Sequence, residues 1–510
     1  MIDNAEVVHG SDGTLHIAPE GLAFRYRWRR PDRPEQEAAT YDEVAAVEVS
    51  PNGRQVLVVF AGPRETWTVK GTARPEAMWA KDSIERHIER AQARKQPLFE
   101  SKADVEELRA AIAEMAEADV AQIPVLADLI IAQAIHHGAT DLHLQPSSDG
   151  TLVRLRVDGQ LATVGEMPAS VGERVVARLE VMARMKSFAA SMAQTGRLTV
   201  EANGRNVDVR LTALPTTDGV RLTARLFDPK RALVDLDALG FEPEPLEVYR
   251  AAIGQPGGCI VMTGPAGSGK TTTMYASLAE LVEADPSRSI STVEEPVELG
   301  MTGVDQTEVN RSAGLDFAAA LRTVLRQDPR VIMVGEIRDI ETAEIAMQAA
   351  LTGHLIFTTV HAPSGAGVLT RLLDLGLEPY VVASSVTMIL AQRLVRVLCP
   401  DCREACELTP DELAWLGIAP IDRQGWETCR AVGCEACGGS GYRGRTGIFE
   451  LVPVTGQMRS AIMDRRPMQE LERLAAGASS GDLWQAGLAK VAAGVTTIDE
   501  LRAVLGKPQQ

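Results

Sequence analysis

A glycine-rich run limits what this chain can fold into more than any other feature. Residues 264–271 fit the pattern G-x-x-x-x-G-K-[ST] at every position, an apolar segment precedes them, and a helical pattern follows. Glycines allow backbone N–H groups to wrap around an anion, and the amino end of a helix favours phosphate. The run therefore predicts a phosphate-binding loop between a strand and a helix, with a plain glycine-rich turn as the alternative. The predicted loop residues are Gly264, Pro265, Ala266, Gly267, Ser268, Gly269, Lys270, Thr271 and Thr272.

The chemistry of such a loop indicates its ligand. Lys270 would reach the β- and γ-phosphates of a nucleoside triphosphate, and the hydroxyl of Thr271 would hold Mg²⁺. The sequence therefore predicts ATP and Mg²⁺ at this position.

Apolar segments recur on both sides of the loop. Strand-like runs at 259–262, 289–293, 331–334 and 355–359 alternate with helical segments. Buried strands interleaved with helices are typical of a parallel sheet covered on both faces. From about Leu239 onward we therefore expect an α/β domain.

Two carboxylates follow strands of this predicted sheet. Glu336 follows the run at 331–334, and Glu294 follows the run at 289–293. Ligands of open α/β sheets bind at the carboxyl ends of strands, so both side chains could converge on the γ-phosphate. One would polarise the attacking water and the other would orient the water shell of the metal. A solvated acidic loop is the alternative for Glu294.

Two histidines flank the run at 355–359: His354 precedes it and His361 follows it. A histidine at a strand end is more often a hydrogen-bonded structural residue than a catalyst. Because two of them bracket one strand, both interpretations are kept, a structural role and nucleotide sensing.

The cysteines indicate a metal site. Cys399 and Cys402 form one C-x-x-C pair, and Cys434 and Cys437 form a second. Four thiolates in two such pairs predict a structural, tetrahedral Zn²⁺ site, although the interval 403–433 is longer than usual. Redox-active or spare thiols are the alternative, and two further cysteines nearby could compete as ligands, Cys406 and Cys429.

The composition limits the class of protein. The chain has 510 residues, a formal net charge of −17 and 45% hydrophobic residues, so wholesale disorder is excluded. An acidic chain is not built for non-specific capture of nucleic acid, so no direct nucleic-acid binding is expected, although a local basic patch could exist. The first residues lack the pattern of a signal peptide, and no stretch is apolar enough for a membrane span. We therefore expect a soluble, cytoplasmic protein.

Changes in pattern divide the rest of the chain. Residues 1–96 indicate short strands closed by one polar helix, a β-rich domain similar to the small PH-like fold. Residues 97–124 are typical of a helical, charged linker, and residues 125–232 combine helices with strands. Residues 399–447 form the predicted zinc-binding subdomain, and residues 448–510 are predicted to be helical.

The motif set as a whole resembles the secretion ATPases of bacterial type II secretion and type IV pilus assembly. Besides the phosphate loop, the segments 325–339 and 441–447 carry the match most specifically. The match continues upstream through 139–143 and 153–159 and covers about residues 125–505.

The resemblance implies a multidomain α/β fold, with a PAS-like α+β domain at 125–232 and a RecA-like P-loop ATPase core at 233–398. It also implies a homo-hexameric ring on the cytoplasmic face of the inner membrane. Its partners would be an inner-membrane platform protein and a membrane-anchored adaptor. Closure of one domain on the other during ATP turnover would move the platform protein, which extrudes pilin subunits.

Site roles follow from the resemblance position by position. Glu294 would be the catalytic glutamate, Glu336 the magnesium-side glutamate, and His354 with His361 the histidine box. An arginine supplied across a domain or subunit boundary stabilises transition-state charge. The candidates for neutralising phosphate charge are Arg210 and Arg225. Two more, Arg322 and Arg326, resemble further ring-interface or nucleotide arginines, and a surface salt bridge is the alternative for each of the four.

Several segments depart from the family pattern. Glu295 replaces the usual aspartate of the acidic box, residues 362–365 replace a polar run, and residues 191–197 lack the usual Arg-Pro character. These departures bear on the turnover rate and not on nucleotide binding. The first hundred residues do not resemble the helical N-terminal module of better-known members, so docking to the usual adaptor is not assumed.

The predicted function is a Mg·ATP-dependent motor that powers type IV pilus or type II secretion pseudopilus assembly. Assembly-type members carry a tetracysteine, which the retraction type generally lacks. The alternatives are a pilus-retraction or DNA-uptake motor of the same superfamily and a nucleotide-gated scaffold that does not hydrolyse ATP.

Overall fold

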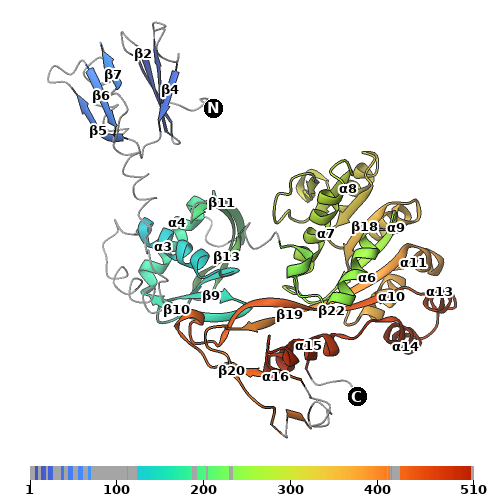
Figure 1. Cartoon of the computed structure of the whole chain (residues 1–510). Helices are drawn as coiled ribbons and strands as arrows, with labels where there is room; N and C mark the ends of the chain where they lie inside the picture. The colour runs from blue at the N-terminus through green and yellow to red at the C-terminus, as the bar shows by residue number, and fades with distance from the viewer. Residues whose placement is uncertain are drawn as a thin grey trace. The chain divides into compact units, whose positions relative to one another are not determined.

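The computed structural model describes most of the chain from Ile123 onward and the strands that precede it. The chain divides into two compact units, Met1–Ala103 and Asp104–Gln510 (Figure 1). Within the described residues, no helix has the length and apolar character needed to cross a lipid bilayer. The described residues are the strands between Glu6 and Lys70, Ile112, and residues 123–186, 192–202, 205–228, 234–409, 412–413, 415 and 425–506.

The first unit contains two antiparallel sheets, one in the order β1-β2-β3-β4 and one in the order β5-β6-β7. The short strands predicted within residues 1–96 are present. The polar helix predicted to close them lies outside the described residues. The strands are β1 (Glu6–His9), β2 (Gly13–Ala18), β3 (Gly21–Tyr26), β4 (Gln36–Ala39), β5 (Val44–Val49), β6 (Gln55–Phe60) and β7 (Trp67–Lys70).

The first part of the second unit is an antiparallel sheet with two helices. Its six strands follow the order β10-β9-β8-β13-β12-β11, and both helices bury apolar side chains in one core with the sheet. Gly172 allows α4 to approach β9 closely, because a Cβ there would lie 2.1 Å from Thr151 Oγ1. The α+β pattern predicted here is present. The elements are α3 (Ile123–His136), β8 (Asp141–Pro146), β9 (Thr151–Val157), β10 (Gln160–Met167), α4 (Ala169–Met182), β11 (Gln194–Ala202), β12 (Arg205–Thr216) and β13 (Gly219–Phe227).

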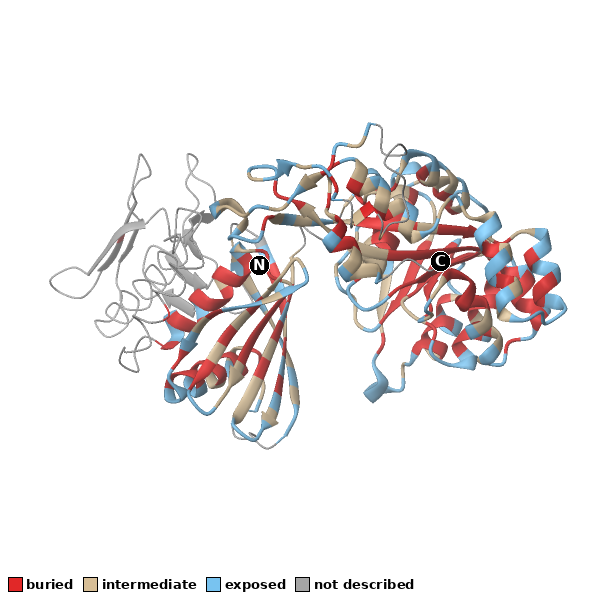
Figure 2. Cartoon of the chain, turned by 90° about the horizontal axis from the view of Figure 1, so that it is seen from below, coloured by how far each residue is buried: buried red, intermediate tan, exposed pale blue. Residues whose placement is uncertain are grey.

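A seven-stranded sheet forms the centre of the remaining part, in the order β16-β15-β17-β18-β14-β19-β22. Neighbouring strands are parallel except β19 and β22, which pair antiparallel. Figure 2 shows buried residues along these strands. The strands are β14 (Gly258–Thr263), β15 (Ile290–Glu294), β16 (Asp305–Glu308), β17 (Val331–Val334), β18 (Leu355–Thr359), β19 (Val386–Leu398) and β22 (Tyr442–Pro453).

Helices cover both faces of this sheet, as the alternation of apolar and helical segments predicts. One face packs against α6 and α7, and the other packs against α8, α9, α10, α11, α13 and α14. The helices are α6 (Pro243–Ile253), α7 (Lys270–Ala284), α8 (Phe317–Val324), α9 (Ile340–Leu351), α10 (Gly365–Asp374), α11 (Pro379–Ser385), α13 (Gly456–Met463) and α14 (Met468–Ala478).

The last strand of this sheet lies far along the chain from the others. β22 crosses the predicted limit between residues 447 and 448, and its pairing with β19 returns the chain to the core sheet. Two helices, α15 (Leu483–Ala492) and α16 (Ile498–Leu505), pack against this strand pair. The predicted helical region 448–510 therefore also contributes part of a core-sheet strand, because β22 extends to Pro453.

A buried ion pair fastens α16 to β19. Arg396 Nε donates to Glu500 Oε2 at 2.8 Å, and the backbone N–H of Arg396 donates to Glu500 Oε1 at 3.0 Å. The side chain of Glu500 is only 6% exposed. Glu500→Ala would leave the Arg396 charge without a partner, so we expect it to lower the free energy of unfolding by about 3–5 kcal/mol.

Urea denaturation of the wild type and the variant measures this change. The matched control is Asp499→Ala, which removes the neighbouring carboxylate from the same helix. Its side chain is 81% exposed and pairs with Arg502 at 3.3 Å, so its loss is expected to cost about 1 kcal/mol or less. Equal losses in the two variants would contradict the buried-pair argument.

Candidate functional site

The glycine-rich loop connects β14 to α7 at the carboxyl edge of the core sheet. Gly264, Gly267 and Gly269 have φ values of 153°, 74° and 90°, a region that glycine adopts without a side-chain penalty. Gly269 is also the N-cap of α7, so the loop leads directly into the amino end of that helix. Unpaired N–H groups at a helix amino end bind anions. The predicted strand–loop–helix arrangement is present.

Two polar side chains of the loop fit a phosphate ligand. Lys270 Nζ donates to the carbonyl oxygens of Gly264 and Pro265, each at 2.9 Å. Burial lowers the pKa of Lys270; the charge of Arg393 acts in the same direction, and the charge of Glu336 opposes it. Ser268 Oγ is buried and has no hydrogen-bond partner within the described part of the chain. A buried hydroxyl needs a partner, and phosphate oxygens would supply acceptors for both side chains.

Glu336 and His361 lie together near the loop. Their positions follow β17 and β18, which are adjacent parallel strands. Glu336 is 16% exposed, and its Oε2 lies 3.9 Å from His361 Nε2. Its Oε1 lies 2.6 Å from Arg338 Nη2. The structure thus brings Glu336 and His361 to the edge that carries Lys270.

His354 lies at the amino end of β18, opposite the end that carries His361. It precedes β18, and its Nδ1 lies 3.0 Å from the carbonyl oxygen of Ala349 and 3.2 Å from Thr352 Oγ1. A strand of this length spans about 17 Å, so the structure does not bring His354 to His361. These contacts fit the structural interpretation of His354, and its role in nucleotide sensing stays a prediction.

Glu294 ends β15, and three donors surround its carboxylate. Its residue surface is 3% exposed, so the alternative of a solvated acidic loop is wrong. The hydroxyl of Tyr275 donates to Oε2 at 2.5 Å. Thr292 Oγ1 and Gln306 Nε2 donate to Oε1 at 2.6 and 3.1 Å. The carboxylate therefore has one well-defined orientation.

The neighbouring Glu295 has a different environment. Arg311 donates to its two carboxylate oxygens through Nε at 2.7 Å and Nη2 at 2.9 Å. This bidentate pair holds the pKa of Glu295 below its ordinary value. The residue that departs from the family pattern is therefore a partner of Arg311 in this structure.

The predicted phosphate-neutralising arginines of the antiparallel domain have no described contact with the loop. Arg210, on β12, donates to the carbonyl oxygen of Val297, and its guanidinium lies 4.5 Å from the centre of the Phe227 ring. Arg225, on β13, donates to Asp141 Oδ1 at 3.1 Å. Their role at the phosphates stays a prediction.

A third arginine, Arg197, lies close to Arg210. It pairs with Glu308 and, like Arg210, lines a cleft of about 1000 Å³ together with residues 297–300. Arg322 of α8 is exposed and pairs with Glu341 of α9, which fits its salt-bridge interpretation. Among the described residues, Arg197, Arg210, Arg225 and Arg322 therefore each have a hydrogen-bond or ion-pair partner.

The sequence analysis missed several side chains that contact the predicted site. Three of them, Tyr275, Thr292 and Gln306, bind Glu294. Two others, Gln392 and Arg393, lie on β19, which pairs with β14. Gln392 Oε1 accepts a hydrogen bond from Thr273 Oγ1 at 2.9 Å, and a Cβ at Gly264 would lie 3.3 Å from Arg393 Nη1. Two adjacent polar residues in the middle of a mostly apolar strand were the available signal for Gln392 and Arg393.

The four cysteines of the two C-x-x-C pairs form one cluster whose sulfur atoms all lie within 4.8 Å of one another. The Sγ atoms of Cys399 and Cys434 are 3.9 Å apart, as are those of Cys402 and Cys437. Thiolates bound to a tetrahedral zinc at about 2.3 Å lie about 3.8 Å apart, so the donor set fits Zn²⁺. The cluster joins the end of β19 to the start of β22, because Cys399 follows β19 and Cys437 lies shortly before β22. A backbone hydrogen bond from Cys399 N to Gly441 O at 2.9 Å links the same two segments.

Cys406 and Cys429 lie outside this cluster. Cys429 lies on β21 (Cys429–Arg430), and Cys406 directly follows its partner strand β20 (Glu404–Ala405). Next to this ladder, Cys406 N donates to Thr428 O at 2.9 Å. Among the described residues, the four-sulfur set is therefore complete without them.

Comparison with known proteins reveals relatives over most of the chain. A family model described as "Type II/IV secretion system protein" matches residues 116–503. Type II secretion system protein E of Pseudomonas aeruginosa is 44% identical over 390 residues, which are 76% of this chain and 77% of that protein. The type IV pilus assembly ATPase PilB of Myxococcus xanthus is 38% identical over 430 residues, 82% of this chain and 76% of that protein. The type II secretion system ATPase E of Vibrio cholerae is 40% identical over 386 residues, 76% of each.

Solved structures show the same fold. The ATPase DotB of Legionella pneumophila matches with a TM-score of 0.55 and 20% identity, over 74% of this chain and 95% of that one. The pilus retraction motor PilT with bound ADP matches with a TM-score of 0.52 and 23% identity, over 75% and 97%. The mixed α/β ATPase fold predicted from the sequence is thereby confirmed. By the extent of the family match and the identity of its relatives, this chain belongs to the type II/IV secretion system protein family and is a secretion ATPase.

Proposed function

We propose that this chain is the Mg·ATP-driven motor of a type IV pilus or type II secretion pseudopilus assembly machine. The observation that carries the proposal is the placement of Lys270, Glu336 and His361 at the carboxyl edge of the core sheet. Relatives named for type II secretion and for pilus assembly support this role. Because the names are divided between two machines, the proposal includes both.

The residues at this edge have separable tasks in the proposed reaction. Residues 264–272 would hold the triphosphate, with Lys270 on the β- and γ-phosphates. Thr271 and Glu336 would hold Mg²⁺, which neutralises charge on the phosphates when bound. Glu294 would orient the attacking water. Arg210 and Arg225 would reach the phosphates only after leaving their present partners, Val297 and Asp141.

The assembly around this site is part of the proposal. A homo-hexamer on the cytoplasmic face of the inner membrane would work with a platform protein and an adaptor. An arginine contributed across a subunit boundary would make hydrolysis depend on ring formation. The four-sulfur cluster supports an assembly-type motor with structural zinc.

The two remaining domain assignments rest on topology. The six-stranded antiparallel sheet with α3 and α4 supports a PAS-like domain at 125–232. The two small antiparallel sheets of the first unit support a PH-like domain at 1–96. The limits 233–398, 399–447 and 448–510 stay as inferred from the sequence, except that β22 (Tyr442–Pro453) crosses the limit at residue 447 and adds a strand to the core sheet.

Phosphate release by the full-length chain tests the proposed function. Glu336→Gln removes the charge that would hold Mg²⁺, so we expect the release rate to fall about 10²-fold while ATP binding persists. The matched control is Glu344→Gln, on the exposed side of α9, which should keep the wild-type rate. Equal background release by wild type and Glu336→Gln would contradict hydrolysis and favour the nucleotide-gated scaffold.

The same variant separates assembly from retraction in cells. Cells that carry Glu336→Gln in place of the wild type should lack surface pili or fail to secrete if the chain is an assembly motor. Filaments that form and stay extended would instead identify a retraction motor.

A further inference from the structure

Glu294 is joined to two separate parts of the core by one buried hydrogen-bond network. Tyr275 lies on α7, the helix that begins with Lys270 of the phosphate loop, and is 1% exposed. Its hydroxyl donates to Glu294 Oε2 at 2.5 Å and accepts from the backbone N–H of Glu298 at 3.2 Å. One phenol thus connects the phosphate-loop helix, the carboxylate and the segment that follows it.

Gln306 makes a second connection to the same segment. Its Nε2 donates to Glu294 Oε1 at 3.1 Å and to the carbonyl oxygen of Leu299 at 2.9 Å. Its Oε1 accepts from the backbone N–H of Met301 at 2.7 Å. Because all the amide atoms have partners, the orientation of Gln306 is determined, and so is the side of the carboxylate that it occupies.

The third donor, Thr292, lies on the same strand as Glu294 and is fully buried. Burial raises the pKa of Tyr275 above its ordinary value, and the charge of Glu294 acts in the same direction. The phenol therefore stays protonated and remains a donor throughout the working pH range.

We propose that Tyr275, assisted by Thr292 and Gln306, is a positioning residue that holds the Glu294 carboxylate in the orientation needed for ATP hydrolysis. The inference rests on the proposed function, in which Glu294 orients the attacking water. A carboxylate with three fixed donors presents its remaining lone pairs in one direction, and a small misplacement of such a group costs about 10²-fold in rate. Since Tyr275 lies on α7, occupation of the phosphate loop and the placement of Glu294 are linked through one helix.

Tyr275→Phe tests the role of the hydroxyl, because the ring still fills the same buried volume. We expect kcat for ATP hydrolysis to fall about 10-fold to 10²-fold while KM for ATP changes little, since the phosphate loop is intact. Thr292→Val removes a different donor with a side chain of the same shape and should lower kcat in the same way.

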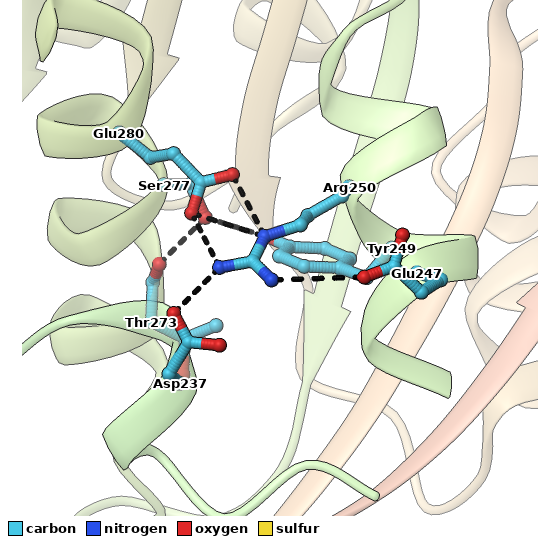
Figure 3. A network of polar contacts seen from close by, with 7 residues as sticks. All are labelled: Asp237, Glu247, Tyr249, Arg250, Thr273, Ser277 and Glu280. Carbon is cyan, nitrogen blue, oxygen red and sulfur yellow. Dashed lines mark hydrogen bonds and ion pairs between the residues drawn. The ribbon is translucent and has the colours of Figure 1, made fainter. Parts of the chain in front are cut away.

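The chain offers a matched control on α6, a helix that contacts α7. Tyr249 of α6 is also completely buried, and its hydroxyl lies 2.7 Å from Ser277 Oγ of α7. Figure 3 shows this pair with Thr273, whose carbonyl oxygen accepts from Ser277 Oγ at 2.7 Å. Tyr249→Phe therefore also removes a tyrosine hydroxyl that contacts α7, but this hydroxyl does not bind Glu294. The variant should keep the wild-type kcat.

The outcomes separate this inference from the proposed function. Wild-type turnover that survives both Tyr275→Phe and Thr292→Val would overturn the positioning role and leave the motor role standing. Equal losses of kcat in Tyr275→Phe and Tyr249→Phe would also overturn it, since the effect would then lie in the packing of α7. A wild-type chain without turnover would overturn the proposed function and this inference together. The supporting result is a loss of kcat in Tyr275→Phe and Thr292→Val, the two variants that remove a donor to Glu294, and not in Tyr249→Phe.

Discussion

Replacement of Lys270 by alanine is expected to lower the rate of ATP hydrolysis by about 10³-fold, the largest effect we expect from a single side chain. In the proposed reaction, the ammonium group binds the β- and γ-phosphates directly. Its present acceptors are two carbonyl oxygens of the loop, which phosphate oxygens would replace. Phosphate release measures the rate, and equilibrium binding of a fluorescent ATP analogue measures the accompanying loss of affinity.

Lys490→Ala is the matched control for this variant. Lys490 is also a largely buried lysine, 13% exposed, and its Nζ lies 2.7 Å from Glu242 Oε1. It belongs to α15, away from the loop, so its loss should affect the melting temperature and not the turnover rate. A Lys270→Ala protein that keeps more than about a tenth of the wild-type rate would contradict the assigned role.

Cys402→Ser is expected to cause the second large effect, loss of the bound zinc and of the structure around it. The wild-type chain should contain one zinc ion per chain, measured by elemental analysis. Three thiolates and a hydroxyl hold zinc poorly, and the binding free energy of a structural zinc site, about 10–16 kcal/mol in small domains, contributes directly to folding. We therefore expect rapid proteolysis between β19 and β22 in the variant and after chelation of the wild type.

Cys406→Ser and Cys429→Ser make the same chemical change outside the four-sulfur cluster. Both residues are partly exposed, and Cys429 Sγ has only a weak contact with the carbonyl oxygen of Glu427 at 3.7 Å. These variants should keep their zinc. Zinc loss equal to that of Cys402→Ser, or a wild-type chain that binds no zinc, would contradict the proposed ligand set.

The features predicted most completely are those encoded in consecutive residues. The phosphate loop requires glycine at positive φ and a lysine at one position, and each requirement is visible in the sequence. The strands β14, β15, β17 and β18 coincide closely with the predicted strand segments, because strands buried on both faces are rich in apolar and β-branched residues. The pairing of two C-x-x-C motifs likewise anticipates the sulfur cluster.

The environment of Glu294 could not be predicted in this way. Its position at a strand end was clear, but a carboxylate in that place can face solvent or the core. The difference is made by Tyr275 and Gln306, which reach it from a helix before it and a strand after it. Neither residue type carries a signal for this role, because buried tyrosines and glutamines find partners in most proteins.

The two histidines illustrate the same limit. The family resemblance implied that they form one histidine box, yet the two ends of a strand lie at opposite edges of its sheet, so His361 lies near Glu336 and His354 does not. Arg393 shows the converse case. It is distant from Gly264 in the chain, and only the pairing of β19 with β14 brings its guanidinium beside the loop.

The amino-acid order alone was enough to specify a glycine-rich turn between a strand and a helix, an alternating α/β core and a four-cysteine cluster, since each depends on local backbone geometry or on a short spacing between residues. Which side chains surround Glu294, where each arginine and histidine lies, and which late strand completes the core sheet were decided by the packing of segments that are far apart in the chain. Such contacts depend on strand order and register, and these are set by the burial of many residues together and not by any one local pattern.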